Sequence, residues 1–383
     1  MSAAATASTT RIPGASRPGA GRLGASRPAP GFRHLQGIEA LGAADPALPL
    51  GLAATLLAPL PPGRPLGRLL RASLPGLTIR SGWLQGELRL RGAVSGRHLV
   101  LALRLPDTMS EAGPGRLRLW HRTAQPGDLC VLPPGHELDG CLHGGLDYAL
   151  VALRPPVLRE ALRRGEIALP GFDPLGLDPA ALFEHAALHR PPATVAAAAM
   201  RRVTAALAIL EQFGDSLSPR AESLLRGELL DALLAPLAAA QNRSRADGET
   251  QAMPEPVMDA TYIVRLVEDY LTVTGAAAGG ELPDIDTICG AFRLSRRSLA
   301  RAFHDSLGLG PMTYIRLLRL SQTRRALVEA RLGPAQEQDD APSSVTAIAL
   351  AHGFTELGRF AVLYRRMFGE TPSETLHGSR RAG

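Results

Sequence analysis

The feature that constrains this chain most is an internal repeat near its C-terminus. LARAFHDSLGLGP at 299–311 and FAVLYRRMFGETP at 360–372 align without a gap, and apolar residues recur in both at three- and four-residue spacing. Each copy ends in a glycine that is followed three residues later by a proline. The spacing predicts two amphipathic helices, and the glycine–proline pair predicts where each helix ends. We therefore expect two equivalent helices in equivalent surroundings.

The first predicted helix separates apolar from basic side chains. Ser295 is placed to cap its N-terminus. Arg297, Arg301 and His304 fall on one face, with Arg296 at its flank, because residues three and four apart share a side of a helix. The opposite face carries Leu299, Ala302, Phe303, Ser306 and Leu307. Like charges four residues apart repel each other in an isolated helix. A negatively charged partner would relieve this repulsion, although a solvated surface helix would show the same pattern of residues.

The residues before each copy predict a second, shorter helix. DIDTICGAF at 284–292 offers Asp284 as a cap and an apolar inner face, and a three-residue turn joins it to the basic helix. VTAIALAHGF at 345–354 precedes the second copy and puts Ala349 in the place of Cys289, which we interpret as a packing residue. A short helix, a tight turn and a basic second helix form a helix-turn-helix unit, whose second helix enters the major groove of DNA.

A continuous helix is predicted between the two units, at 312–330. At about 1.5 Å per residue it spans roughly 27 Å. With the breadth of a helix added, this length approaches the roughly 34 Å between successive major-groove faces on one side of DNA. The spacing predicts that both basic helices enter adjacent grooves of one duplex.

At these residues the sequence resembles the AraC family of transcriptional regulators. The motifs LSRRSLARAF, LGLGPMTYIRLLRL, IALAHGF and FGETPSE carry the resemblance, which covers about 261–376. It implies an all-α domain of about seven helices that binds double-stranded promoter DNA through two helix-turn-helix units. It further implies a homodimer that acts with RNA polymerase in the bacterial cytoplasm, at the nucleoid, as an activator rather than a repressor. Neither a cofactor nor an enzymatic activity is implied.

The resemblance and the helical geometry together assign roles to individual residues. In the family, base contacts of the first unit come from positions that match Arg297, Ala300 and Arg301, and an arginine there can bind guanine through two hydrogen bonds. The same projection gives Gly358 and Val362 as the base-reading positions of the second unit. The predicted backbone contacts are Arg296, His304, Arg316, Arg319, Arg359, Arg365 and Arg366. The residues predicted to shape the motif are Ser295, Leu299, Phe303, Gly308, Pro311, Ala349, Gly353, Phe354, Phe360, Tyr364, Phe368, Gly369 and Pro372.

The second unit departs from the family pattern at three places. Val362 stands where the family usually has arginine, Glu356 stands where a serine cap is expected, and Thr375-Leu376 replaces the closing Tyr-Arg. We therefore expect the first helix to supply most of the base discrimination. The second would supply backbone affinity, with Val362 against a thymine methyl group.

The net charge of +6 on the 383 residues does not by itself indicate DNA binding. Five arginines precede the first acidic residue, Glu39, whereas from Asp259 onward 15 arginines face 14 acidic residues, a net charge of only +1. DNA binding must rest on where the arginines stand rather than on bulk charge.

Ahead of these helices the sequence predicts strands, so the fold class is an α+β multidomain protein. GELRLRG, HLVLALRL and GRLRLWHR alternate apolar and polar residues with period two. QPGDLCVLPPGHELDG is similar to the jelly-roll modules that often precede this DNA-binding domain in the family, which implies a sensor for a small-molecule effector. We predict a disordered low-complexity tail at 1–45, a β-rich sensor domain at 46–155, a helical packing and dimerisation segment at 156–241, a linker at 242–258, the DNA-binding domain at 259–378 and a tail at 379–383.

No effector pocket follows from the sequence. Trp83, Trp120 and Arg104 could line an apolar pocket, but core and edge positions explain them more simply. His98, His121, His136 and His143 lack the His-x-His spacing of jelly-roll metal sites, so no metal is expected. The apolar stretches are too short, or too interrupted by proline and arginine, to predict a membrane span.

Three alternative functions stay open. One is a constitutive DNA-binding protein without an effector, and another is a metal-dependent jelly-roll enzyme fused to a DNA-binding domain. A third is a DNA-repair alkyl acceptor, which needs a reactive cysteine in a basic setting. Cys130 and Cys141 stand beside acids and prolines instead, although a disulfide between them stays open.

Overall fold

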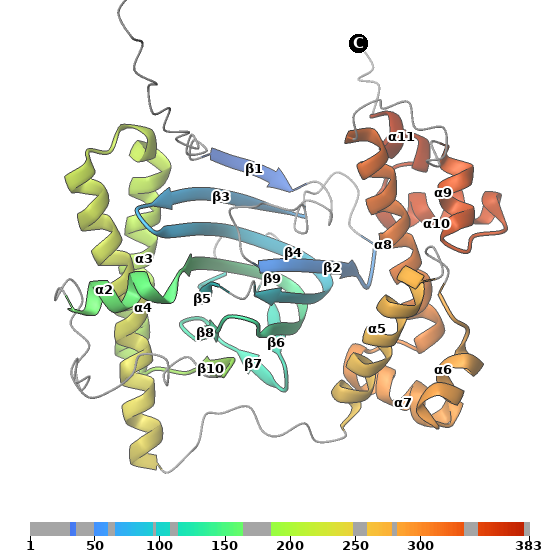
Figure 1. Ribbon diagram of the computed structural model, residues 1–383, viewed down its shortest axis with the longest axis horizontal. Coiled ribbons are helices and arrows are strands. Elements are labelled where there is room, and N and C mark those ends of the chain that lie inside the picture. Colours follow the sequence, from blue (N-terminus) through green and yellow to red (C-terminus); the bar gives the residue numbers. More distant parts are fainter. Residues whose placement is uncertain are drawn as a thin grey trace, which may run out of the picture.

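The chain folds into a β-rich N-terminal domain and a helical C-terminal domain that lie side by side (Figure 1). The computed structural model describes residues 31–35, 50–59, 66–94, 97–107, 114–163, 185–247, 259–277, 282–332 and 344–378. The α+β multidomain architecture expected from the sequence is confirmed.

Two long strands organise the N-terminal domain. β4 (Leu77–Val94) and β9 (Glu137–Leu153) pair antiparallel along almost their whole length. Each also pairs with different strands at its two ends, so both belong to two halves of one antiparallel sheet. One half adds β1 (Gly31–Leu35), β3 (Gly67–Leu74), β5 (Leu99–Leu105), β8 (Leu129–Leu132) and β10 (Ala187–His189). The other adds β2 (Leu50–Leu56), β6 (Arg116–Leu119) and β7 (Arg122–Ala124).

Three helices pack on the outer side of the first half (Figure 1). They are α2 (Pro155–Arg163), α3 (Ala193–Phe213) and α4 (Pro219–Asp247), with a 3₁₀ turn, η2 (Gly214–Ser216), between the last two. Leu101 and Val151 of the sheet share one apolar core with Val203 of α3 and Leu230 of α4. By length and composition alone α3 could cross a membrane, but its inner side is buried in this core.

Three predicted boundaries are wrong within the described residues. Gly31–Leu35 form β1 on the edge of β3 rather than part of a disordered tail, since five residues suffice to add an edge strand to a long neighbour. Ala187–His189 form β10 inside the segment predicted to be helical. α4 continues to Asp247, six residues into the predicted linker, because no glycine or proline stops it there. The remainder of the 1–45 tail, residues 248–258 and residues 379–383 lie outside the described residues.

The C-terminal domain contains the two predicted helix-turn-helix units. Its described residues form the seven expected helices: α5 (Ala260–Ala277), α6 (Ile285–Phe292), α7 (Arg296–Leu307), α8 (Pro311–Leu332), α9 (Val345–Ala351), α10 (Leu357–Phe368) and α11 (Pro372–His377). α8 serves both units, because Tyr314 packs with Phe303 of α7 while Leu327 packs with Tyr364 of α10.

The two units begin their helices differently. Ser295 caps α7 by accepting a hydrogen bond from the Ser298 amide at 3.0 Å, and Asp284 caps α6 from the Thr287 amide at 2.8 Å. Glu356 stands at the N-cap of α10 and makes no side-chain cap hydrogen bond. Both α7 and α10 end as predicted, at Gly308 (φ 72°) and Gly369 (φ 77°), in the left-handed conformation that glycine adopts without strain.

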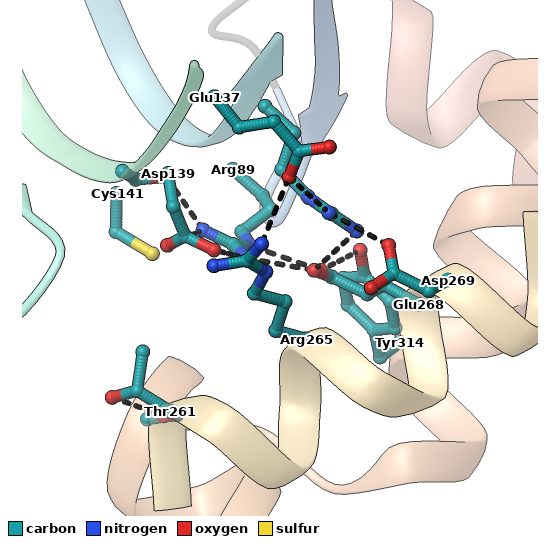
Figure 2. Close-up of polar contacts among 12 residues, drawn as sticks. Arg89, Glu137, Asp139, Cys141, Thr261, Arg265, Glu268, Asp269 and Tyr314 are labelled. Atoms are coloured by element: carbon teal, nitrogen blue, oxygen red, sulfur yellow. Dashed lines mark hydrogen bonds and ion pairs between the residues drawn. The ribbon is translucent and has the colours of Figure 1, made fainter. Parts of the chain in front are cut away.

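A buried arginine joins the two domains (Figure 2). Arg89 of β4 binds both carboxylate oxygens of Asp139 on β9 at 2.7 Å. It also binds both carboxylate oxygens of Glu268 on α5, at 2.9 and 2.7 Å. The side chains of the three residues are 4, 7 and 4% exposed. We call Arg89, Asp139 and Glu268 the interdomain ion triad. Planar, bidentate pairing of this kind gives the strongest charge-assisted hydrogen bonds.

Further polar contacts surround the interdomain ion triad. Arg91 pairs with Asp269 at 2.7 Å and lies 3.5 Å from Glu268. Arg265 of α5 pairs with Glu137 of β9 at 3.2 Å. The Tyr314 hydroxyl of α8 donates a hydrogen bond to Glu268. These contacts place α5 and α8 against the outer face of the sheet.

The interdomain ion triad makes stability depend on pH. Burial acts to raise the pKa of Asp139, but the hydrogen bonds and charge of Arg89 outweigh it and hold that pKa below its ordinary value. Because the folded-state pKa is the lower one, this stabilisation is complete above the ordinary value near about 3.9 and is lost as the pH falls further. We predict a smaller fall in the free energy of unfolding below about pH 5 for Asp139→Asn than for the wild type. Urea denaturation across this pH range measures it, and superimposable pH profiles would contradict the assignment.

The missing cap predicts a stabilising substitution. Glu356→Ser should raise the free energy of unfolding by about 0.5–1 kcal/mol, because a serine hydroxyl can accept an orphan amide of the first turn of α10. Glu356 is exposed and its nearest cation is Arg359 at 3.8 Å, so little is lost by replacing it. Ser295→Ala is the matched control and should lower stability by about 1 kcal/mol. Chemical denaturation compares the two, and a destabilised Glu356→Ser chain would refute the capping argument.

Candidate nucleic-acid interface

The outward face of α7 presents the residues predicted to read bases. Arg297, Ala300, Arg301 and His304 are all exposed, while Leu299 and Phe303 on the other side are completely buried. Arg301 is 83% exposed, and its nearest carboxylate is Asp305 one turn away, at 3.6 Å. A weak surface pair of this length leaves the guanidinium available to a partner.

Arg296 differs from its neighbours because it already has a partner. Its guanidinium binds both carboxylate oxygens of Asp286 on α6 across the turn, with one distance at 2.7 Å. This hydrogen bonding raises the pKa of Arg296. Both side chains are well exposed, so the pair braces the turn from outside. A phosphate contact by Arg296 remains a prediction, and it would have to compete with Asp286.

The second unit presents a less basic face. Gly358 and Val362 lie outward on α10, and Val362 is 69% exposed. Arg359, Arg365 and Arg366 are exposed at its sides. The helix therefore offers an apolar centre with arginines around it, which is the arrangement predicted from the sequence. Its contacts with DNA stay a prediction.

An aromatic stack holds the second unit together. Phe354, Phe360, Tyr364 and Phe368 follow one another with ring centroids 4.8, 5.6 and 4.7 Å apart. Thr375, at the first of the two positions that depart from the family's Tyr-Arg, is buried and accepts a hydrogen bond from the Tyr364 hydroxyl at 2.8 Å. Thr375 therefore helps to close the core of this unit through its hydrogen bond with Tyr364.

Arg319 is turned into the protein rather than toward solvent. It donates a hydrogen bond to the carbonyl of Leu282 at 2.8 Å. A Cβ added to Gly353 would lie 3.5 Å from the centre of its guanidinium. The side chain thus braces the junction between the two units, and a phosphate contact by Arg319 stays a prediction that would have to compete with this hydrogen bond. Arg316 is exposed and lines, with Arg319 and Arg359, a crevice of about 310 Å³ between the units, and the phosphate contacts of all three stay predictions.

The interior of the β-rich domain holds an apolar cavity of about 100 Å³. Arg104, Tyr148 and Asp128 are among the few polar side chains on its walls. Arg104 pairs with the buried Asp107 at 2.7 Å and donates to the carbonyl oxygens of Ala124 and Gly115, while its Nε finds no hydrogen-bond partner among the described residues. Burial raises the pKa of Tyr148 to about 12, so its hydroxyl stays protonated. The apolar lining consists of Leu69, Leu84, Leu90, Ala102, Leu103, Leu117, Leu119, Ala124, Cys130, Leu138, Leu146, Leu150 and Leu188.

The residues of this domain that the sequence offered as pocket or metal candidates lie at different places in the structure. Arg104 lines the cavity, whereas Trp120 is part of the surrounding core and Trp83 lies outside the lining. His143 pairs with Glu87 on the neighbouring strand. Among the described residues, no group of three or more His, Cys, Asp or Glu side chains is placed to hold a metal ion. Burial raises the pKa of Cys130 to about 12, which disfavours the reactive thiolate.

Sequence reasoning missed the residues that join the domains. Arg89 and Arg91 alternate with leucines in GELRLRG, a pattern that normally indicates a solvent-facing side. In the structure that side faces α5 instead. The available signal was Glu268, an acidic residue between Val267 and Leu271 on the inner face of α5, because a buried charge requires a partner.

Comparison with known proteins adds to this geometry. Residues 288–378 match the family described as a helix-turn-helix domain. A "Probable thc operon regulatory protein" of Rhodococcus erythropolis is 34% identical over 160 residues, which cover 42% of this chain and 40% of that protein. The XylDLEGF operon transcriptional activator 2 of Pseudomonas putida is 41% identical over 83 residues, 22% of this chain and 48% of that protein. The aligned regions span less than half the length of these relatives.

The solved structures that match are more distant in sequence. The AraC-like transcriptional activator CuxR is 15% identical with a TM-score of 0.37, covering 77% of this chain and 94% of that one. ToxT of Vibrio cholerae is 11% identical with a TM-score of 0.27, covering 79% and 99%. The match at 288–378, the operon regulators among the relatives and the two helix pairs joined by α8 all indicate the same kind of domain. The C-terminal domain of this chain is therefore a helix-turn-helix domain similar to those of these operon regulators.

Proposed function

We propose that the chain is a sequence-specific DNA-binding transcriptional regulator that responds to a small-molecule effector. The observation that carries the proposal is the exposed basic face of α7, with Arg297 and Arg301 pointing away from a buried core. A second outward face, on α10, is joined to the first by α8. Arginine on an exposed helix face can hydrogen-bond guanine through its two terminal nitrogens in the major groove.

The connecting helix supports simultaneous binding by both units. α8 has 22 residues, which correspond to about 33 Å at 1.5 Å per residue. This matches the roughly 34 Å of one DNA turn, so α7 and α10 can enter successive major grooves on one side of the duplex. The first helix would supply most of the base discrimination, and the second would supply phosphate contacts around the apolar Val362.

The cavity of the β-rich domain supports an effector. It is somewhat smaller than the cavities of about 150 Å³ that hold benzene. Its walls are mostly leucine, and Arg104 offers an unsatisfied Nε. A buried donor without a partner favours a ligand with an acceptor group. We infer a small, mainly apolar effector with one carboxylate or comparable acceptor.

The relatives also support a role in activating transcription. The XylDLEGF protein is a transcriptional activator, as is RhaS of Escherichia fergusonii, which is 37% identical over 93 residues, 24% of this chain and 30% of that protein. We propose activation on promoter DNA together with RNA polymerase, in the bacterial cytoplasm. Phe213 and Leu224 are 47 and 68% exposed near the junction of α3 and α4, and they are candidate contacts of a homodimer. The relatives are regulators of transcription, which argues against an enzyme.

Two arginines of the first unit test the DNA proposal. The full chain is first used to select a binding sequence from a random DNA pool. Arg301→Ala should then lose about 1–3 kcal/mol of discrimination at one base pair, because a base contact is removed. Arg296→Ala should instead weaken selected and random DNA alike and lessen the salt dependence. Fluorescence anisotropy at several salt concentrations measures both. Equal effects of the two variants on selected and random DNA would overturn the assignment, and a pool that yields no preferred sequence would overturn the proposed function.

The effector proposal predicts a thermal shift that depends on the cavity. Small carboxylic acids of four to eight carbons are compared with the alcohols of equal length. A fitting acid at about 100 times its Kd should stabilise the chain by about 2.7 kcal/mol, and its melting temperature should rise accordingly. Ala102→Leu narrows the cavity and should remove this shift. A shift that persists in Ala102→Leu, or no shift with any acid, would contradict an effector of this class in this cavity.

A further inference from the structure

Three strands form a wall between the cavity and the DNA-binding domain. β4, β9 and β6 are neighbours, and Arg89 pairs in register with Cys141, which pairs in turn with Arg118. These three side chains form a row on the outer face of the sheet. Arg89 binds Glu268 of α5, and Cys141 packs with the core of the first helix-turn-helix unit. The outer face of the wall is therefore the docking surface of the DNA-binding domain.

The inner face of the same wall lines the cavity. Successive residues of a strand point to opposite faces of a sheet. Leu117 and Leu119 flank Arg118 on β6, and both line the cavity. Leu90 beside Arg89 and Leu138 beside Asp139 line it too. Residues adjacent in sequence thus touch the cavity on one side and the DNA-binding domain on the other, with one strand layer between them.

Arg118 connects this wall directly to α7. Its guanidinium donates a hydrogen bond to the carbonyl of Ser306, in the last turn of that helix. Carbonyls of the last turn lack a partner within the helix, and a cation near them is favourable. The Ser306 hydroxyl also donates to Thr261 on α5, at 3.2 Å. The C-terminal end of α7 is therefore held from two sides, by β6 and by α5.

The docking leaves the outward face of α7 open. Ser306 is buried, whereas Arg301, little more than one turn earlier, is 83% exposed. The β-rich domain thus fixes the position of the helix without covering the residues predicted to meet DNA.

We propose that Arg118 is a positioning residue that couples occupancy of the cavity to the order of the last turn of α7. This inference rests on the proposed function for its biological meaning. A molecule in the cavity displaces Leu117 and Leu119, and β6 shifts with them. The hydrogen bond from Arg118 to Ser306 changes as a result, and with it the position of the helix that carries Arg297 and Arg301.

Hydrogen–deuterium exchange on the full chain without DNA tests the contact. Arg118→Met keeps the length of the side chain but removes the donor, and exchange in a peptide covering 304–310 should rise by about fivefold or more. Arg118→Lys keeps a cation and should restore part of the protection. Arg116→Met is the matched control, because Arg116 is an exposed arginine on the same strand and should leave exchange unchanged.

A filled cavity tests the coupling. Ala102→Leu, on β5 across the cavity from the wall, serves as the occupant, and Cys130→Leu on β8 replaces it if the first variant does not fold. The filling substitution should change exchange in 304–310 in the wild type and equally in Arg116→Met. In Arg118→Met that change should fall to less than about one third, because the connection is missing. An equal change in all three backgrounds would overturn the proposal.

The result is separable from the proposed function. Hydrogen–deuterium exchange is measured without DNA, so it tests the coupling even if the chain selects no DNA sequence. If a DNA sequence is selected, the affinity for it should change on filling the cavity in the wild type and in Arg116→Met, and should change much less in Arg118→Met. Affinity that responds to the filled cavity as strongly in Arg118→Met as in the wild type would count against Arg118 as the coupling residue.

Discussion

The arrangement of the two domains depends on one buried cation. Arg89 pairs with Asp139 within its own domain and with Glu268 in the other, with hydrogen bonds to all four carboxylate oxygens, and Arg91 lies 3.5 Å from Glu268 as a further cation. Burying three charges costs several kcal/mol per ion, and their attraction offsets this cost only in good geometry with satisfied hydrogen bonds. A guanidinium meets this demand through its planar set of donors, which a lysine lacks. Removing one partner would leave an uncompensated charge at the junction, so α5 is fixed to β4 and β9.

The same cation organises the DNA-binding domain. Glu268 also accepts the Tyr314 hydroxyl, and Tyr314 lies at the start of α8 beside Phe303 of α7. A single carboxylate thus orders α5 and α8, and through them the first helix-turn-helix unit. The second unit is built differently, with an aromatic stack in its core and no side-chain cap on α10. The unit held by Arg89 and Glu268 is the one with the capped α7 and with arginines at the predicted base-reading positions. The unit farther along α8 offers Val362 there instead.

Sequence patterns sufficed where a local rule decides the structure. The repeat located α7 and α10, the buried residues Leu299, Ala302, Phe303, Ser306 and Leu307 follow from helical spacing, and Ser295 and Gly308 terminate α7 as their chemistry dictates. Sequence patterns did not suffice where a side chain binds a residue that is distant in sequence. Arg89 and Glu268 are 179 residues apart, and nothing near Arg89 indicates that its strand is covered by a helix. The hydrogen bond of Arg319 was missed for the same reason, since its acceptor is a backbone carbonyl before α6. The cavity arises from side chains of several strands, and periodicity cannot predict a void.

In the proposed regulator, the β-rich domain holds α7 in place while leaving the outward face of that helix free. This account requires the docked arrangement to persist on DNA. Pulsed electron paramagnetic resonance measures the distance between the domains. The spin labels are placed at exposed Arg116 of β6 and Arg325 of α8, in a chain with Cys289→Ala. We expect one narrow distance distribution that is unchanged when the selected DNA is added. A shifted or broadened distribution on DNA would show that the domains separate, and it would contradict the account.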